Sequence, residues 1–241
     1  MAAKYEEIMK SKGFMPYYLE KLPPSLTQKA KEELGETDER RALALKQFRK
    51  AILADKKLSC PTDDEFLMQF LRVRKYNVDT ALGLLKNYFN LIASHPEFYD
   101  KLDKEKMNQL AGASFINFLP FRANDGCLIV IAKMENWNPD EVNVHILFCT
   151  LTALALCVAS YPANQITGIR LIFDAKGYSF KQVRCFVPRY IPMVAKALRN
   201  CLPVRFKSIH IVNEAVVFQY AWSVLKLVLS EKIKNRCCMN R

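Results

Sequence analysis

The 241-residue chain has little of what the common enzyme classes use. It has only three histidines, and its seven glycines stand singly, so no G-x-G-x-x-G, P-loop, G-x-S-x-G or H-E-x-x-H motif is present. Metal chemistry and histidine-base chemistry therefore have few candidate residues. We expect no catalytic residue, no metal site and no cofactor, and the sequence predicts a protein that is not an enzyme.

The chain also lacks a long apolar run. The longest, from Ile146 to Ala159, is interrupted by Thr150 and Thr152 and falls short of the ~20 residues that span a bilayer. The first residues are acidic where a signal peptide would be basic and then apolar. The eight cysteines show no C-x-x-C spacing, which favours reduced thiols. These features predict a cytoplasmic protein whose membrane contact is peripheral and reversible.

Positive charge is abundant and unevenly distributed. The net charge is +12, and from Lys176 to the end thirteen Lys and Arg face only Glu214 and Glu231. These bases alternate with apolar runs such as 209–212. Because phosphates are anionic and acyl or isoprenoid chains are not, a basic surface over an apolar core favours a protein that holds a lipid and touches an anionic membrane.

The first hundred residues are patterned as helices. Thr37 precedes a charged helix, residues 62–65 form a capping box before a second one, and Asn77 precedes a third that ends near Pro96. Each carries apolar residues at helical spacing. We therefore expect a small helical domain over residues 1–98.

The pattern changes in the rest of the chain, where residues 99–241 are expected to form a second domain. Short apolar runs at 127–132, 169–173 and 206–212 predict strands. Between them we expect a helix from Pro139 to Ser160 and further helices after Gly177. Strands that alternate with long helices indicate an α/β fold.

Three ordered stretches carry a resemblance to a known family. They are Asp63–Leu67 with Phe70–Arg72, Gly168–Asp174 with Gly177, and Pro203–Glu214. At these residues the chain resembles the CRAL-TRIO lipid-transfer family, in the branch of tocopherol-transfer and retinaldehyde-binding proteins. The similarity runs from about Lys29 to Met239, and residues 30–34 and 39–41 resemble arthropod members in particular.

The resemblance implies a mixed sheet that floors a lipid pocket closed by a mobile helix, here residues 215–227. Alternation along a strand would place residues 207, 209 and 211 on one face. By the resemblance, the following residues face the ligand: Leu151, Ala155, Ile169, Leu171, Phe186, Val187, Tyr190, Val194, Ala197, Leu198, Leu202, Ile209 and Phe218. For any one of them, ordinary core packing is an equally good explanation.

The resemblance also implies a site for a phosphatidylinositol bisphosphate headgroup at Arg205, Lys207, Lys232 and Arg236, which are all basic here. Cations that converge on phosphate make strong, charge-assisted hydrogen bonds. The implied function is exchange: the phosphoinositide opens the gating helix, and a tocopherol, a retinoid or a similar isoprenoid leaves for the membrane.

Two departures from the family pattern concern the gate and the end of the chain. The family's Asn-Glu-Pro is Asn213-Glu214-Ala215 here, so the hinge is expected to be softer. The last strand would be residues 237–241, where the chain stops, and we expect a C-terminally short form with a leakier pocket.

Two other functions remain open. One is a non-transporting membrane adaptor or scaffold that binds phosphoinositides with a leaky or empty pocket. The other, more remote, is binding of nucleic acid, which also suits a basic chain. It would require aromatic side chains interleaved with exposed bases, and Phe173, Tyr190 and Phe218 lie on predicted inner faces instead. We therefore expect no nucleic-acid partner, and the sequence does not indicate an oligomeric state.

Overall fold

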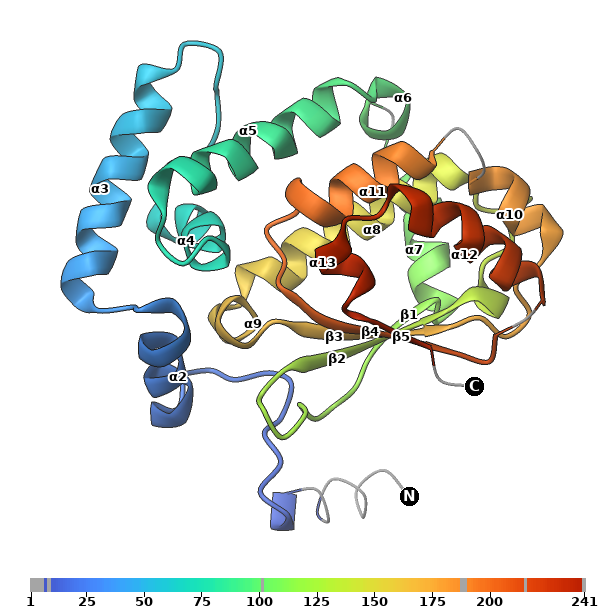
Figure 1. The fold of residues 1–241 in the computed structure, drawn as a ribbon, viewed down its shortest axis with the longest axis horizontal. Helices are drawn as coiled ribbons and strands as arrows, with labels where there is room; N and C mark the ends of the chain where they lie inside the picture. Colours follow the sequence, from blue (N-terminus) through green and yellow to red (C-terminus); the bar gives the residue numbers. More distant parts are fainter. Residues whose placement is uncertain (1–6, 8–9, 101, 187–189, 215, 240–241) are drawn as a thin grey trace.

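The structure is a computed structural model that describes residues 7, 10–100, 102–186, 190–214 and 216–239. Figure 1 shows a group of helices formed by the first part of the chain, beside a sheet whose helices lie on one of its sides. The predicted α/β fold, with helices first and a mixed sheet after them, is confirmed.

Four helices make up the N-terminal bundle: α2 (Pro24–Leu34), α3 (Asp38–Ala54), α4 (Asp64–Val73) and α5 (Val78–Ala93). Side-chain caps define where three of them begin. Thr37 accepts a hydrogen bond from the Arg40 amide, and Asn77 accepts one from the Thr80 amide, as the sequence predicted. At α4 the cap is Asp63 and not Thr62, because the Asp63 carboxylate lies 2.9 Å from the Phe66 amide nitrogen.

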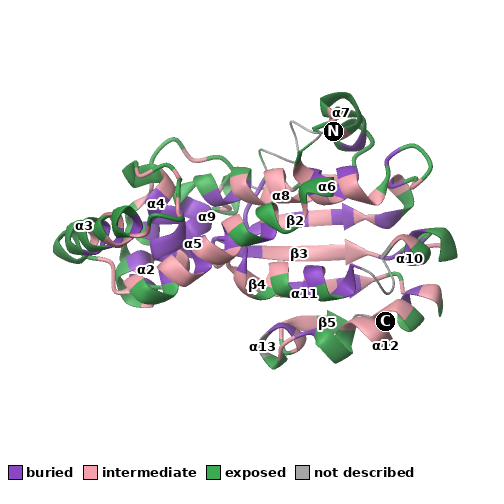
Figure 2. Ribbon diagram, turned by 90° about the horizontal axis from the view of Figure 1, so that it is seen from above, coloured by how far each residue is buried: buried purple, intermediate pink, exposed green. Residues whose placement is uncertain are grey.

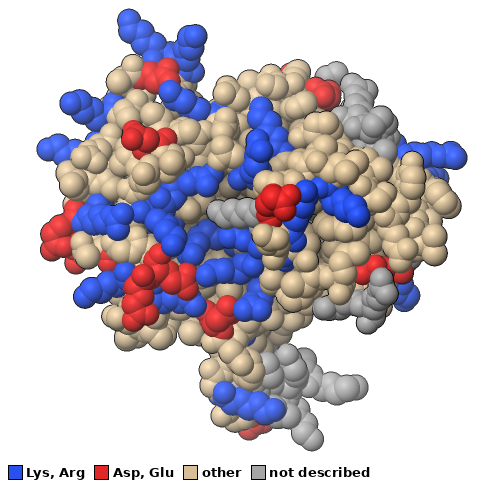
Figure 3. All heavy atoms as spheres, in the orientation of Figure 1, with Lys and Arg blue, Asp and Glu red and all other residues tan. Residues whose placement is uncertain are grey.

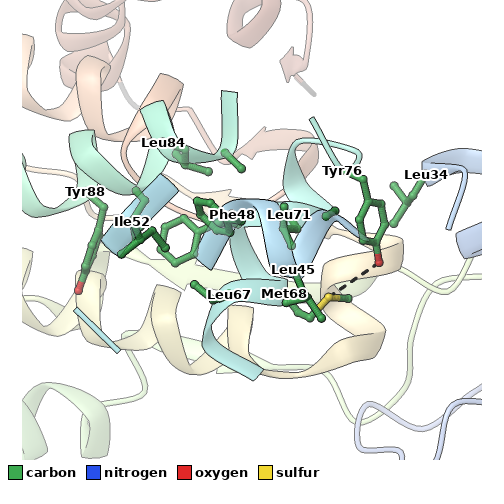
Figure 4. Packing of buried hydrophobic residues seen from close by; sticks show 14 of the residues in the cluster. Leu34, Leu45, Phe48, Ile52, Leu67, Met68, Leu71, Tyr76, Leu84 and Tyr88 are labelled. Carbon is green, nitrogen blue, oxygen red and sulfur yellow. Dashed lines mark hydrogen bonds between the residues drawn. The ribbon is translucent and has the colours of Figure 1, made fainter. Parts of the chain in front are cut away.

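The bundle is packed around a closed apolar core. The side chains of Phe48, Leu67, Leu71 and Leu84 are essentially inaccessible to solvent, and Figure 4 shows them converging from α3, α4 and α5. The hydroxyl of Tyr76 lies 4.0 Å from the sulfur of Met68 at one end of this core. Burial of this apolar surface is what stabilises helices whose outer faces are highly charged.

Two short helices connect the bundle to the sheet. These are α6 (Pro96–Tyr99) and α7 (Lys104–Gly112). Phe98 of α6 is buried against His145 and Tyr190 of the α/β part, with ring centroids 4.7 and 5.3 Å away. The boundary predicted between residues 98 and 99 falls inside α6, and the division of the chain into two domains stays a prediction.

The sheet has five strands in the order β1-β2-β3-β4-β5. The strands are β1 (Ile116–Phe118), β2 (Leu128–Lys133), β3 (Ile169–Asp174), β4 (Phe206–Val212) and β5 (Cys237–Met239). β1 pairs with β2 in antiparallel fashion, and the other pairs are parallel. Of the last strand that the sequence predicted, residues 240 and 241 lie outside the described residues.

An irregularity in the pairing of β3 and β4 corrects one prediction. Ile169 pairs with Phe206, but the next residue, Arg170, pairs with Ser208, so Lys207 is the extra residue of a bulge. A bulge interrupts the alternation of side chains. Phe206 therefore shares a face with Ile209, and the predicted common face of residues 207, 209 and 211 is wrong at Lys207.

The remaining helices are α8 (Val144–Ser160), α9 (Pro162–Thr167), α10 (Phe180–Phe186), α11 (Ile191–Asn200), α12 (Val216–Val228) and α13 (Glu231–Lys234), with a 3₁₀ turn η1 (Met134–Asn136). α8 begins later than predicted, because the Asn143 side chain accepts hydrogen bonds from the His145 and Ile146 amides and caps the helix there. α12 matches the predicted gating helix, whose first residue, 215, lies outside the described residues.

Among the helices that the structure describes, none is long and apolar enough to cross a bilayer.

Candidate functional site

An apolar cavity lies between the sheet and the helices on its covered side. Its volume is about 340 Å³, within the usual range for small-molecule sites. Side chains of β2, β3 and β4 form the floor, and side chains of α8, α11 and α12 form the walls. Figure 2 shows that the strands are largely of intermediate exposure, whereas α4 and α5 of the bundle contain fully buried segments.

Nine of the residues predicted to face a ligand lie on the wall of this cavity: Leu151, Ala155, Ile169, Leu171, Val194, Leu198, Leu202, Ile209 and Phe218. Alternation in β3 and the helical spacing of α8 and α11 bring them together. That a lipid contacts them stays a prediction.

Two predicted cavity residues lie elsewhere. The Tyr190 hydroxyl is 3.0 Å from His145 Nε2, and Ala197 packs into the same cluster around Phe98. The reason is the helical period of α11: Val194 and Leu198, four residues apart, face the cavity, whereas Met193 and Ala197 lie on the adjacent side of the helix, toward α5 and α6. Tyr190 and Ala197 therefore help to hold α11 against the preceding helices.

Two further predicted residues are not settled by the structure. Phe186 ends α10, but its side chain is outside the description, and Val187 lies outside the described residues.

Sequence reasoning missed several cavity residues. Phe206 was missed because the bulge that turns it inward has no local sequence signal, and Phe115 and Phe118 were missed because β1 is too short to show a pattern. The cavity-facing residues of α12, such as Trp222 and Leu225, follow Phe218 at helical spacing, so that spacing was a usable signal.

One end of the cavity is aromatic. The ring of Phe218 lies 5.5 Å from Phe173, 5.9 Å from Tyr178 and 6.3 Å from Trp222, measured between centroids. Burial raises the pKa of Tyr178 to about 12, so this side chain remains a protonated hydrogen-bond donor at neutral pH. Tyr178, Trp222 and Cys237 are the described lining residues with side-chain donors, and the rest of the wall offers shape and dispersion contacts.

The basic residues predicted to bind a headgroup are gathered where β4 begins. Arg205 Nη2 and Lys207 Nζ lie 3.0 and 2.9 Å from the same oxygen, Oε2 of Glu33 in α2. Arg205 Nη1 also donates to the backbone carbonyls of Gln165 and Ile166 at the end of α9. The Arg205 guanidinium is therefore held in place by main-chain groups as well as by a carboxylate.

Arg236 belongs to the same neighbourhood. Its carbonyl accepts a hydrogen bond of 2.8 Å from the amide of Ile209 in β4, which holds it beside the bulge. Burial, together with the positive charge of Arg205, lowers the pKa of Arg236. Among the described residues no carboxylate pairs with it. Lys232 lies in α13, and its side chain is outside the description.

Gly168 makes this arrangement possible. Its φ of +80° is accessible to glycine, and a Cβ there would lie 2.5 Å from the Arg205 carbonyl oxygen and 3.1 Å from Lys207 Cγ. The turn into β3 can therefore pass directly against the basic residues. Figure 3 shows Lys and Arg side chains gathered in the middle of one face of the molecule, with acidic side chains beside them.

Comparison with known proteins agrees with the geometry. The profile of the CRAL/TRIO domain matches residues 113–241, more than half of the chain, and the chain belongs to this family. "Alpha-tocopherol transfer protein-like" of Homo sapiens is 32% identical over 226 residues, which are 92% of this chain and 65% of that protein. Clavesin-1 of Rattus norvegicus is 27% identical over 219 residues, 89% of this chain and 62% of that protein.

The chain thus spans 65% of the length of the tocopherol-transfer-like relatives and 62% of that clavesin. A solved structure, "Crystal structure of Sfh5", superposes with a TM-score of 0.50 at 14% identity and covers 85% of this chain and 81% of that one, which supports the fold. The predicted resemblance to the CRAL-TRIO family is confirmed.

Proposed function

We propose that this protein binds a small hydrophobic lipid in the cavity and delivers it to membranes, where the basic cluster recognises a phosphatidylinositol bisphosphate headgroup. The observation that carries the proposal is the cavity itself. A void of about 340 Å³ with an almost wholly apolar wall is expensive to leave empty, because its lining loses dispersion contacts. A lipid restores those contacts.

The chemistry of the wall limits the cargo. A lining of aliphatic and aromatic side chains with few donors suits a molecule with one small polar end and a long apolar body, such as a tocopherol, a retinoid or another isoprenoid. Such a wall discriminates by shape, and one methylene group changes the binding free energy by only ~1–3 kcal/mol. No step in this function requires a catalytic residue.

The route for cargo leads past α12. Phe218, Trp222 and Leu225 of this helix line the cavity, so the helix must move for a lipid to enter or leave. Its outer face exposes Val216, Tyr220 and Leu227, which suits reversible contact with a membrane interior. Asn213, just before the helix, has a left-handed φ of 54°, and its side-chain amide donates a hydrogen bond of 2.8 Å to Asp174 Oδ1.

The headgroup site would direct the protein to membranes that contain phosphoinositides. Arg205, Lys207 and Arg236 are half-buried and offer several donors, and Lys232, which lies in α13, is proposed as the fourth basic residue of the site. Guanidinium and ammonium groups bind phosphate through charge-assisted hydrogen bonds. The protein is proposed to act in the cytoplasm and to associate reversibly with phosphoinositide-containing membranes, without a nucleic-acid partner.

Lipid binding is tested first by mass spectrometry of organic extracts and of the native protein purified from eukaryotic cytosol. We expect one stoichiometric apolar lipid. Ala155→Phe, which fills the cavity, should lose it. Ala153→Phe, a half-buried position of the same helix away from the cavity wall, is the matched control and should keep it. Equal lipid content in both variants would contradict binding in the cavity.

Headgroup recognition is tested by lipid transfer to vesicles with and without phosphatidylinositol bisphosphate. The double variant Arg205→Glu, Lys207→Glu should transfer more slowly to the phosphoinositide vesicles and still bind cargo. Equal transfer rates for the wild type and the variant would refute the headgroup site. A protein that carries no lipid but binds these vesicles would instead support a membrane adaptor.

A further inference from the structure

The carboxylate of Glu33 is bound to two of the cations of the proposed headgroup site. Its Oε2 accepts hydrogen bonds from both Arg205 and Lys207, and its Oε1 lies 3.4 Å from Lys29 Nζ. One anionic group with two oxygens thus meets three cations, which is the same pattern of contacts that a phosphate makes with basic side chains. Because the same donors cannot serve both anions fully, the two must compete.

The place of Glu33 in its helix favours this interpretation over a role in helix stability. Glu33 lies in the last turn of α2, which Gly35 ends in the left-handed conformation. The C-terminus of a helix carries partial negative charge, so an acid there is disfavoured and a base is preferred. Both hydrogen bonds to the carboxylate come from residues that are distant in sequence: 172 positions separate it from Arg205 and 174 from Lys207.

The carboxylate is firmly held but can be reached by solvent. Burial alone would raise the pKa of Glu33, but hydrogen bonds from Lys207 and Arg205 and the charges of Lys207 and Lys29 outweigh it and lower the pKa to about 2. The side chain is 31% exposed, so it can swing outward without unfolding α2. The helix itself is anchored by buried Leu26, Ala30 and Leu34, and Lys29 Nζ lies 2.7 Å from the Asp125 carbonyl oxygen.

We propose that Glu33 is a built-in competitor for the headgroup phosphate, and that an anionic lipid must displace it from Arg205 and Lys207 to bind. This inference rests on the proposed headgroup site. Displacement adds the same unfavourable free energy for every headgroup. Headgroups of low charge, with few bonds to offer in return, therefore stay largely unbound, and those with several phosphate charges still bind. Glu33 thus sets the charge that a membrane lipid must present.

Displacement of the Glu33 carboxylate by a headgroup can be distinguished by measurement from repulsion of the headgroup by a carboxylate that stays in place. If Glu33 stayed in place and only repelled the ligand, its effect would grow with the charge of the headgroup. If the ligand displaces it, removing the carboxylate strengthens binding by a similar factor for every headgroup. Arg236, which has no carboxylate partner among the described residues, is available to a ligand in either case.

The test uses the full chain and vesicles of neutral phosphatidylcholine containing phosphatidylserine, a phosphatidylinositol monophosphate or a bisphosphate, at one ionic strength. Glu33→Gln should bind all three anionic vesicles roughly tenfold more tightly than the wild type. Glu32→Gln is the matched control: it removes the same charge one residue away, where Gln28 is the one donor to the carboxylate among the described residues. It should bind as the wild type does.

A double-mutant cycle ties the effect to the contact. A protein that already carries Arg205→Gln and Lys207→Gln serves as the background. Adding Glu33→Gln to it should change vesicle affinity less than twofold, because the carboxylate then no longer withholds the two cations of the headgroup site. Thermal unfolding of each variant checks that the fold is kept.

The outcomes separate this inference from the proposed function. If the wild type binds bisphosphate vesicles and Glu33→Gln binds them equally or more weakly, the inference is wrong and the headgroup site stands. A gain that rises steeply with headgroup charge would also overturn displacement. If neither protein binds phosphoinositide vesicles better than neutral ones, the headgroup site itself fails, and the inference fails with it.

Discussion

The N-terminal bundle and the α/β part bury similar kinds of side chain but reach different results. In the bundle, Phe48, Leu67 and Leu84 fill the space between α3, α4 and α5 and are sealed from solvent. In the α/β part, Leu151, Leu198 and Ile209 line a cavity of about 340 Å³. Leu151 and Leu198 are half-buried, and Ile209 is buried. Apolar composition alone does not distinguish a closed core from a binding cavity. The distance between the helices and strands that carry the apolar side chains determines which of the two forms.

Loss of the contact between the two regions should reduce the stability of the protein most. Arg72 of α4 bonds Glu36 through two nitrogens, at 2.9 and 2.7 Å, and Gln165 of α9 at 2.7 Å. Arg72→Ala removes both short hydrogen bonds to the buried Glu36 carboxylate and leaves it only a 3.7 Å contact with Arg41, so the free energy of unfolding is expected to fall by about 3–5 kcal/mol. Urea denaturation measures it. The double variant with Glu36→Leu should recover much of the loss; no recovery would show that Arg72 acts through packing.

A matched pair of leucines tests the difference in packing directly. Leu84→Ala in the bundle creates a new void and should lower the free energy of unfolding by about 2–5 kcal/mol. Leu198→Ala enlarges a cavity that already exists, and we expect a loss of about 1 kcal/mol. Urea denaturation of both variants, each freed of bound lipid, gives the comparison. Equal losses would mean that the α/β part is packed as tightly as the bundle.

Lipid binding should stabilise only one of the two regions. At a free lipid concentration of a hundred times the dissociation constant, binding adds about 2.7 kcal/mol. Amide hydrogens in α8, α11 and α12 should then exchange up to ~100-fold more slowly, whereas those of α3 and α4 change little. Hydrogen exchange with mass spectrometry reads this out, with Ala155→Phe as the control that should not respond. Uniform protection of both regions would contradict it.

The contact of Glu33 in α2 with Lys207 in β4 should contribute least to the free energy of unfolding, and its contribution should depend on pH. The pKa of Glu33 is lowered from 4.5 to about 2, so its contribution to stability is complete above about pH 4.5 and is lost as the pH falls toward 2. The free energy of unfolding should therefore drop less between pH 5 and pH 3 in Glu33→Gln than in the wild type. Glu32→Gln should follow the wild type. Identical pH profiles for all three proteins would exclude the contact as a source of acid sensitivity.

Much of the fold could be predicted where the signal is local. Thr37 and Asn77 begin their helices as predicted because a short polar side chain satisfies free amides within three residues. The central strands β3 and β4 were found as short apolar runs next to Gly168 and after Pro203. β1 was missed because its three residues carry too little pattern, and α8 begins at Val144 and not at Pro139 because the Asn143 side chain caps the helix there.

The candidate site was also predictable only in part, because part of it depends on contacts between segments that are distant in sequence. Of the residues that the resemblance implied for this wall, Val194 and Leu198 line the cavity and Tyr190 and Ala197 do not, because which side of α11 meets the cavity depends on where α5 and α6 lie. The bulge at Lys207 and the approach of Glu33 left no trace in the neighbouring sequence.

The sequence by itself determined the family, the order of the main helices and central strands, and the gathering of positive charge near the end of the chain, since these depend on residues that are close in sequence. Only the tertiary structure decided that the apolar faces enclose a cavity and that Glu33 closes on Arg205 and Lys207. Those features arise from contacts between segments up to 174 residues apart, whose distances are set by packing and not by any local pattern.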